Sequence, residues 1–198
     1  WKVSVLLRKL ANEAHQKKWF AKLMSDSSFL FAHALTEPKG ASDRWLGYNA
    51  PEAAMDTKAV KTKGGWLING RKHYISNGYD AGLYIVYANT SPEKGMMQGT
   101  SSFIVPRGTD GFKVSRCNET IGCRFMNNGE LEFIDCFVPD DQLLAEGNSL
   151  SKAGIYFRPG KIIQASKNLG VGQAALEKTA SFVQTYERGG RLLLKHQI

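Results

Sequence analysis

Short apolar runs separated by turn-forming residues fill the middle of this 198-residue chain. Rich in β-branched and aromatic residues, they predict strands at 29–35, 58–63, 66–68, 73–76, 83–89, 101–106, 112–116 and 130–138. Gly and Asn adopt the backbone conformations of tight turns, and they stand between the runs at 64–65, 69–70, 77–78, 108–111 and 127–129. Many short strands at regular spacing predict a compact β-barrel or sandwich.

Helical periodicity flanks this β-rich region on both sides. Residues 3–25 carry apolar side chains at the i, i+3, i+4 spacing of amphipathic helices, and Asn12 is predicted to separate two of them. Helical pattern returns after Pro139 and extends to about residue 186, with Pro159 expected to end or kink the helix. The class is therefore α+β, and the expected divisions are 1–28 (helical), 29–142 (β) and 143–198 (helical).

The two ends and the composition suggest an internal piece of a longer protein. The chain begins at Trp1 without an initiator Met, and it ends at Ile198 without a terminating signal. With 42% hydrophobic and 22% charged residues, the composition is typical of a soluble globular protein. No apolar run approaches the roughly 18–20 residues that a membrane span requires, so we expect no membrane association.

The net charge of +8 raises the question of nucleic-acid binding. The basic residues are spread along the chain without a dense block or interleaved aromatics, which favours solvated faces over a polynucleotide-binding surface. An anionic small ligand would suit them equally well. The cysteines are odd in number and lack metal-ligand spacing; they predict reduced thiols packed in strands, with a metal or redox role as the less favoured alternative. We expect no metal site.

Two motifs carry the chemistry. The first, residues 33–43, reads HALTEPKGASD, and the second, residues 69–78, reads NGRKHYISNG. In the first motif Gly40 and Ala41 would let the backbone approach a flat, phosphate-bearing cofactor closely, while Thr36 and Ser42 supply hydroxyl donors.

Together these motifs resemble the flavin-cradling segments of the acyl-CoA dehydrogenase family. Further phrases in the family's order support the resemblance, namely 66–72 (WLINGRK), 102–106 (SFIVP), 121–124 (IGCR) and 132–139 (EFIDCFVP). The resemblance covers nearly the whole chain. It implies a central β-barrel domain between helical domains, enclosing flavin adenine dinucleotide (FAD).

The resemblance also implies roles for residues of the first motif. His33, Leu35 and Thr36 would line the edge of the isoalloxazine through backbone and hydroxyl groups, with Thr36 bonding its pyrimidine side. Ala41 and Ser42 would meet the pyrophosphate. Glu37 is structural in this family. Lys39 departs from the family pattern, because Gly usually follows Thr-Glu-Pro.

In the second motif, Tyr74 stands where the family usually has a Trp that covers the flavin. Ser76 stands where it has a Thr that hydrogen-bonds near N5. Both substitutions keep the chemistry, since an aromatic face and a hydroxyl remain. Without the family, the alternative is that Tyr74 is a core aromatic of the sheet and Ser76 a turn residue. Residues 44–52 are longer than the usual connection; they would flank the active site or pack on another subunit.

Substrate contacts follow from the same resemblance. Ser42, Arg158 and Lys161 would bind the acyl-CoA, with Arg158 replacing the usual acid. Tyr186 replaces the Arg that typically reaches the flavin pyrophosphate of a neighbouring subunit. Either Arg188 or Arg191 would substitute for it, or this subunit would pair differently. This departure indicates an atypical member.

The implied reaction is FAD-dependent oxidation of an acyl-CoA thioester to the α,β-enoyl-CoA. A carboxylate base, expected C-terminal to residue 198, abstracts the α-proton while the β-hydride passes to flavin N5, so this sequence names no catalytic residue. We expect electron-transferring flavoprotein as acceptor, a homo- or hetero-oligomer (dimer or tetramer), and a bacterial-type cytoplasmic location, with the mitochondrial matrix as alternative. A flavin-dependent monooxygenase or oxidase on the same fold, or a non-catalytic subunit, remain alternatives.

Overall fold

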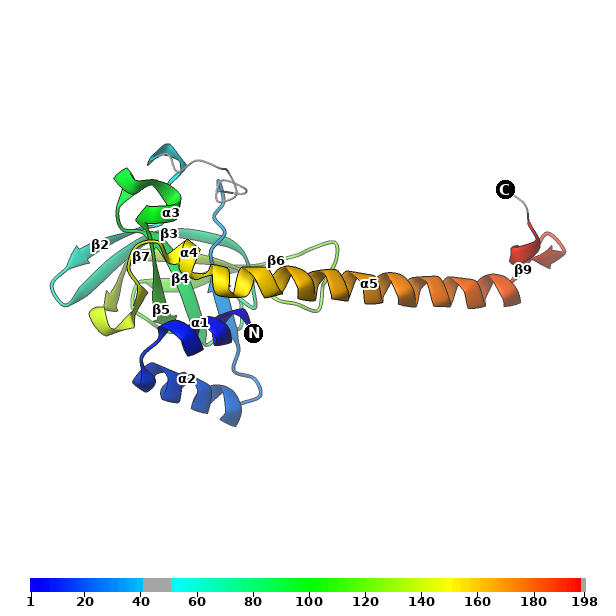
Figure 1. Cartoon of the computed structure of the whole chain (residues 1–198), viewed down its shortest axis with the longest axis horizontal. Coiled ribbons are helices and arrows are strands. Elements are labelled where there is room, and N and C mark those ends of the chain that lie inside the picture. Colours follow the sequence, from blue (N-terminus) through cyan, green and yellow to red (C-terminus); the bar gives the residue numbers. More distant parts are fainter. Residues whose placement is uncertain (41–50, 197–198) are drawn as a thin grey trace. The chain divides into compact units, whose positions relative to one another are not determined.

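A computed structural model describes residues 1–40 and 51–196 of the chain. It divides into two compact units, Trp1–Tyr156 and Phe157–Ile198, which we treat separately. The first unit holds a sheet with short helices, and the second consists mainly of one long helix (Figure 1).

Two helices open the first unit, α1 (Lys2–Leu10) and α2 (Glu13–Ser25). The side chain of Asn12 accepts a hydrogen bond from the backbone N–H of His15 at 2.9 Å, which satisfies a free donor in the first turn of α2. The predicted break at Asn12 is therefore confirmed. Leu6 and Leu7 of α1 are buried, at 1% and 0% exposure.

Eight strands form the sheet of the first unit. They are β1 (Phe31–Ala34), β2 (Lys58–Thr62), β3 (Gly65–Ser76), β4 (Leu83–Asn89), β5 (Thr100–Pro106), β6 (Phe112–Asn118), β7 (Asn128–Pro139) and β8 (Leu143–Ala145). Their order is β6-β7-β3-β2-β4-β5-β8, with β1 paired to β4. Within the described residues, β6 and β8 form two edges that do not pair with each other. The expectation of a closed β-barrel was therefore wrong, because β8 is only three residues long and pairs with β5 alone.

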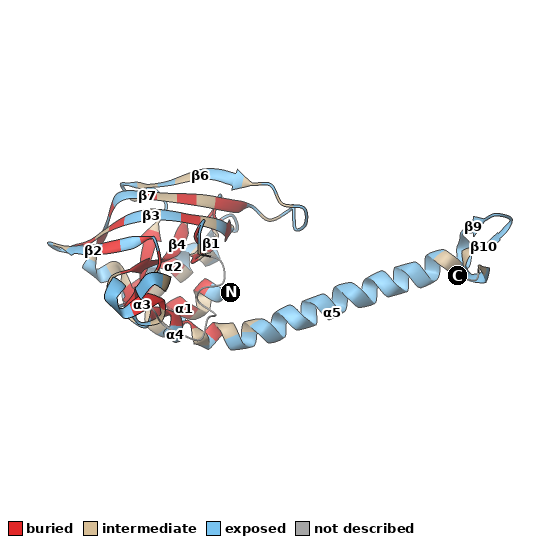
Figure 2. Cartoon of the chain, turned by 90° about the horizontal axis from the view of Figure 1, so that it is seen from above, coloured by how far each residue is buried: buried red, intermediate tan, exposed pale blue. Residues whose placement is uncertain are grey.

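Strand β4 is the centre of the core. All seven of its residues are buried, and it pairs with β1 in parallel and with β5 antiparallel. It meets β2 at a single pair, Lys58 with Asn89. Buried residues lie along the strands and on the first helices (Figure 2); the core cluster includes Ala34, Ile68, Val86, Phe103, Leu131 and Val138.

The predicted strands at 66–68 and 73–76 are one strand, β3, so the turn expected at Asn69-Gly70 was wrong. Gly70 has φ +145°, and a Cβ there would lie 2.6 Å from the Cα of Thr57. The glycine thus permits close approach of two backbones rather than a turn. The Asn69 side chain reaches across to β7, where its amide donates to the Asp135 carboxylate at 3.0 Å.

Two bulges interrupt the pairing of β3 with β7. In the first bulge, two residues of β7 lie opposite the single residue Asn69 of β3. The extra residue is on β7, so the alternation of side chains along β3 is preserved there. The second lies between Lys72 and Ile75 of β3, opposite a shorter stretch of β7. Tyr74 lies within it at φ +54°. This extra residue changes which face of the sheet the following side chains occupy.

Short elements complete the first unit: η2 (Pro51–Ala53), η3 (Pro92–Lys94), α3 (Gly95–Gly99), η4 (Asp140–Gln142) and α4 (Ser149–Lys152). Helix α5 (Gly154–Thr185) begins at the end of this unit and continues through Pro159. Of the two expected effects of Pro159, ending the helix was therefore wrong, since its missing N–H removes only the bond to residue 155.

The second unit adds β9 (Glu187–Arg188), β10 (Arg191–Leu192) and η5 (Leu193–Lys195) after α5. In the part of the chain that the structure describes, no helix has both the length and the apolarity to cross a membrane.

Candidate functional site

The two sequence motifs meet in the first unit through a backbone hydrogen bond. His73 N–H donates to the carbonyl oxygen of Thr36 at 2.9 Å. Thr36 lies two residues beyond the end of β1, and His73 lies near the end of β3. The structure thus brings together the segments that carry His33, Leu35 and Thr36 with those that carry Tyr74 and Ser76.

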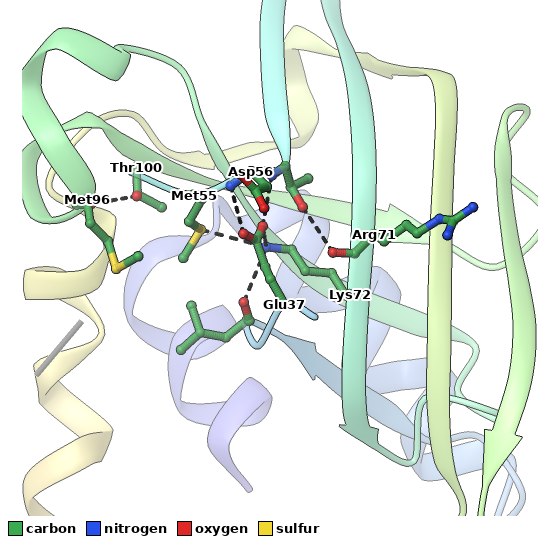
Figure 3. Close-up of polar contacts among 9 residues, drawn as sticks. Glu37, Met55, Asp56, Arg71, Lys72, Met96 and Thr100 are labelled. Atoms are coloured by element: carbon green, nitrogen blue, oxygen red, sulfur yellow. Dashed lines mark hydrogen bonds and ion pairs between the residues drawn. The ribbon is translucent and has the colours of Figure 1, made fainter. Parts of the chain in front are cut away.

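A buried ion pair fixes the first motif against β3 (Figure 3). Lys72 Nζ lies 2.8 Å from Glu37 Oε1, and the Lys72 and Glu37 residues are 0% and 6% exposed. The ammonium also donates to the carbonyl of Leu35 at 3.2 Å. The other donors to Glu37 are the backbone N–H groups of Asp56 and Thr57, at 2.7 and 2.9 Å. The cluster therefore ties three segments together, with every charge hydrogen-bonded.

The environment of this pair keeps Glu37 ionised. Burial by itself would raise the pKa of Glu37, but the charge and hydrogen bond of Lys72 and the hydrogen bonds from Thr57 outweigh it and hold that pKa below its ordinary value. Burial lowers the pKa of Lys72, and the charge of Glu37 opposes this shift. With both oxygens engaged, Glu37 is an anchor rather than a proton acceptor.

Tyr74 presents an aromatic surface next to this anchor. Tyr74 is 57% exposed. Its ring stacks on that of His73, with ring centroids 3.9 Å apart and an interplanar angle of 15°. The alternative that Tyr74 is a core aromatic is therefore wrong. The bulge between Lys72 and Ile75 explains this, because unbroken alternation from Lys72 would turn Tyr74 inward. Ser76 is exposed at the last position of β3.

The side chain of His33 lies in a cluster with two tyrosines. Its Nε2 is 2.7 Å from Tyr156 Oη and 3.2 Å from Tyr87 Oη. Tyr87 and Tyr156 are 1% and 0% exposed, and burial raises the pKa of Tyr87. The cluster joins β1, β4 and the first residues of α5. The two tyrosine hydroxyls fix the His33 imidazole, and the backbone after His33 leads to Thr36.

The remaining predicted residues belong to the second unit or lie outside the described residues. Arg158 and Lys161 are exposed on α5, and Arg188 is exposed on β9, where its carbonyl oxygen lies 2.8 Å from His196 Nε2. All three belong to the second unit. Ala41 and Ser42, like most of the 44–52 segment, lie outside the described residues.

The residues present fit a flavin, judged from their own geometry. The exposed Tyr74 ring offers a face on which a flat heterocycle can stack. Beside it, His73 Nε2 is buried and has no hydrogen-bond partner among the described residues. A buried polar atom without a partner favours a ligand that supplies one. Thr36, half-buried at the same place, adds a hydroxyl.

Three residues that hold this site in place were not predicted from the sequence. Lys72 lies within the second motif but was given no role there, and Thr57 and Met55, whose sulfur lies 3.7 Å from Lys72 Nζ, belong to no motif. One signal could have found Lys72, because alternation from Trp66 and Ile68 places it on the buried face of β3.

The sequence of this chain is similar to those of several known proteins. A sequence model described as "Acyl-CoA dehydrogenase, middle domain" matches residues 32–136. An acyl-CoA dehydrogenase of Bacillus subtilis is 35% identical over 94% of this chain and 47% of its own length. A cyclohex-1-ene-1-carbonyl-CoA dehydrogenase of Geobacter metallireducens is 32% identical over 89% of this chain and 44% of its own length.

One solved structure has a similar fold. The acyl-CoA dehydrogenase of Geobacillus kaustophilus superposes with a TM-score of 0.87 at 26% identity, covering 98% of this chain and 49% of that one. The chain thus spans about half the length of the curated relatives it matches. Because the family's middle domain covers more than half of the sequence, this chain belongs to the acyl-CoA dehydrogenase family.

Proposed function

We propose that this chain forms the flavin-binding part of an enzyme that oxidises an acyl-CoA thioester to the α,β-enoyl-CoA. The observation that carries the proposal is the hydrogen bond from His73 to Thr36, which joins the two flavin-cradling motifs beside an exposed Tyr74 ring. FAD, when bound, would accept the hydride from the substrate β-carbon.

The chain's own residues would bind and orient. Tyr74 would stack against the ring system, and the Thr36 hydroxyl would donate to the pyrimidine edge. The His73 imidazole would gain a partner for its buried Nε2. Lys72 and Glu37 would hold the Thr36 backbone in place from beneath, because their ion pair links the first motif to β3.

Proton abstraction would fall to a carboxylate outside this chain. Glu37 is unsuited to that role, because it is buried, ion-paired and bonded to two backbone N–H groups. We propose that Ser42, Arg158 and Lys161 contact the acyl-CoA, that Arg188 contributes to the pyrophosphate site, and that an electron-transferring flavoprotein accepts the electrons.

The test uses the purified full-length protein under anaerobic conditions. A yellow protein that an acyl-CoA bleaches without oxygen, with release of the enoyl-CoA, is the expected result. Hydrogen peroxide or a hydroxylated product in air, without anaerobic bleaching, would instead indicate an oxidase or monooxygenase. A colourless protein that does not take up added FAD would contradict the proposal and favour a non-catalytic subunit.

A further inference from the structure

The first 25 residues, which contain α1 and α2, are strongly basic. They hold six of the 26 Lys and Arg residues but only one of the 18 Asp and Glu residues, Glu13. The six basic residues are all exposed: Lys2, Arg8, Lys9, Lys17, Lys18 and Lys22. Within the described residues, no carboxylate forms an ion pair with any of them. This positive charge is therefore available to attract an anionic partner.

An apolar groove of about 400 Å³ lies between these two helices, which are drawn in blue in Figure 1. Its lining consists of Trp1, Ser4, Val5, Arg8, Lys9 and Phe20. Residues 1, 4, 5 and 8 share one face of α1, because residues three and four apart are neighbours on a helix. The opposite face of α1 is buried in the first unit through Val3, Leu6 and Leu7. Helix α1 thus has a core face and a separate, outward face that forms the groove.

Positive charge surrounds the apolar wall of the groove. Arg8 and Lys9 are part of the lining, and Lys17 lies three residues before Phe20, on the same face of α2. The Arg8 guanidinium donates to Gln16 Oε1 at 3.2 Å, a neutral acceptor that leaves its charge uncompensated. An apolar centre with a charged rim is the usual anatomy of a protein interface, and the complement of this one is an apolar side chain between carboxylates.

Shape and charge together select the class of partner. A second copy of this chain would bring two basic surfaces together, which like-charge repulsion opposes. A helix binds a membrane surface through an apolar face that enters the lipid, but the apolar face of α1 is buried at Leu6 and Leu7. A polynucleotide supplies charge but no aliphatic side chain to cover Val5. A protein segment supplies both.

We propose that the groove between α1 and α2 binds an acidic protein segment. One large apolar side chain of that segment packs on Val5 and Phe20, and carboxylates on either side of it pair with Arg8, Lys9 and Lys17. Because these basic side chains are exposed, binding weakens as the salt concentration rises. The surface is separate from the proposed cofactor and substrate contacts, since α1 and α2 carry none of those residues.

The test is a fluorescence-anisotropy titration of the full-length protein with a labelled peptide in which Glu-Glu-Ala-Leu is repeated three times. Arg8→Glu with Lys9→Glu reverses two rim charges, and we expect binding to weaken about tenfold or more. The matched control is Lys58→Glu with Lys63→Glu, which changes the net charge equally at two exposed residues of the sheet region; its affinity should stay within about twofold of the parent. A peptide with Ser in place of Leu should bind about tenfold less tightly, because it lacks the apolar side chain.

Equal affinity of the Arg8/Lys9 variant and its control would overturn the proposal, as would equal affinity for the Leu and Ser peptides. No saturable binding of the Leu peptide would also overturn it. Tighter binding of a thymidine oligonucleotide or of phosphatidylglycerol vesicles would assign the surface to a different class of partner and refute this one.

A second measurement does not depend on the variants. Trp1 lines the groove and is 51% exposed, so hydroxyl radicals should oxidise it in the free full-length protein, and the Leu peptide should protect it. Protection of Trp1 in the free protein would mean that another part of the protein covers the groove, and the proposal would fail.

Discussion

Replacing Lys72 by Met tests how the first motif is held. The Lys72 ammonium is fully buried and contacts Glu37 Oε1 at 2.8 Å and the Leu35 carbonyl at 3.2 Å. Met has a similar length but no charge. The substitution therefore leaves the Glu37 carboxylate buried with only the N–H groups of Asp56 and Thr57 as partners.

The expected loss of stability is large. Removing one partner of a buried ion pair costs about 3–5 kcal/mol, and the two remaining hydrogen bonds to Glu37 favour the lower end, about 3 kcal/mol. Because domains are stable by only about 5–15 kcal/mol, urea unfolding of the full-length protein should show a clearly lower midpoint. Flavin content should fall with it, since Thr36 follows the anchored Leu35.

Two controls separate this effect from a general loss of charge. Lys113→Met breaks a pair with Glu132 in which the lysine side chain is 64% exposed, and exposed pairs contribute only about 0.2–1 kcal/mol. Adding Glu37→Leu to Lys72→Met should recover part of the stability, because no charge then remains buried. The reasoning fails if Lys72→Met lowers the midpoint no more than Lys113→Met does.

Four further outcomes follow from the structure. Gly70→Ala should lower the free energy of unfolding by about 2–4 kcal/mol in urea unfolding, because residue 70 has φ +145° and its new Cβ would clash with Thr57. Thr36→Val should raise the Kd of FAD about 2- to 10-fold in fluorescence titration, for one lost donor. Tyr74→Ala should weaken FAD binding more than Tyr74→Phe does, since only the former removes the stacking face. The lowered pKa of Glu37 contributes stability at pH values above its unfolded pKa of about 4.5, and this stability is lost as the pH falls through the lower folded value. The urea midpoint should therefore fall at acid pH, and it should fall less in the Lys72→Met/Glu37→Leu variant.

The strands were predictable from sequence because each one carries its own local pattern. The runs at 58–63 and 83–89 became β2 and β4 with nearly the predicted bounds. The turn predicted at Asn69-Gly70 was wrong, because a glycine that permits close approach to Thr57 cannot be distinguished in sequence from a glycine in a turn. Barrel closure was beyond reach as well, since it depends on long-range pairing of the edge strands β6 and β8.

For the site, the motifs predicted which segments meet but not how they are held. The charge of Lys72 suggests exposure, so only its partner Glu37, far away in sequence, explains its burial. Glu37 was predicted to be structural, and its contacts agree. Arg158, Lys161 and Arg188 fall in the second unit, and their roles in binding stay predictions.

The bulge in β3 explains how one strand serves both as anchor and as binding surface. Lys72 lies on the buried face of β3, and strict alternation would place Tyr74 on that same face. The extra residue between Lys72 and Ile75 lets Ile75 return to the core at 1% exposure while Tyr74 turns outward. His73, between them, uses its backbone N–H to hold Thr36 and its ring to support Tyr74. A regular strand could bury the lysine or expose the aromatic two residues later, but not both, so the bulge is what couples the ion pair to the exposed aromatic surface.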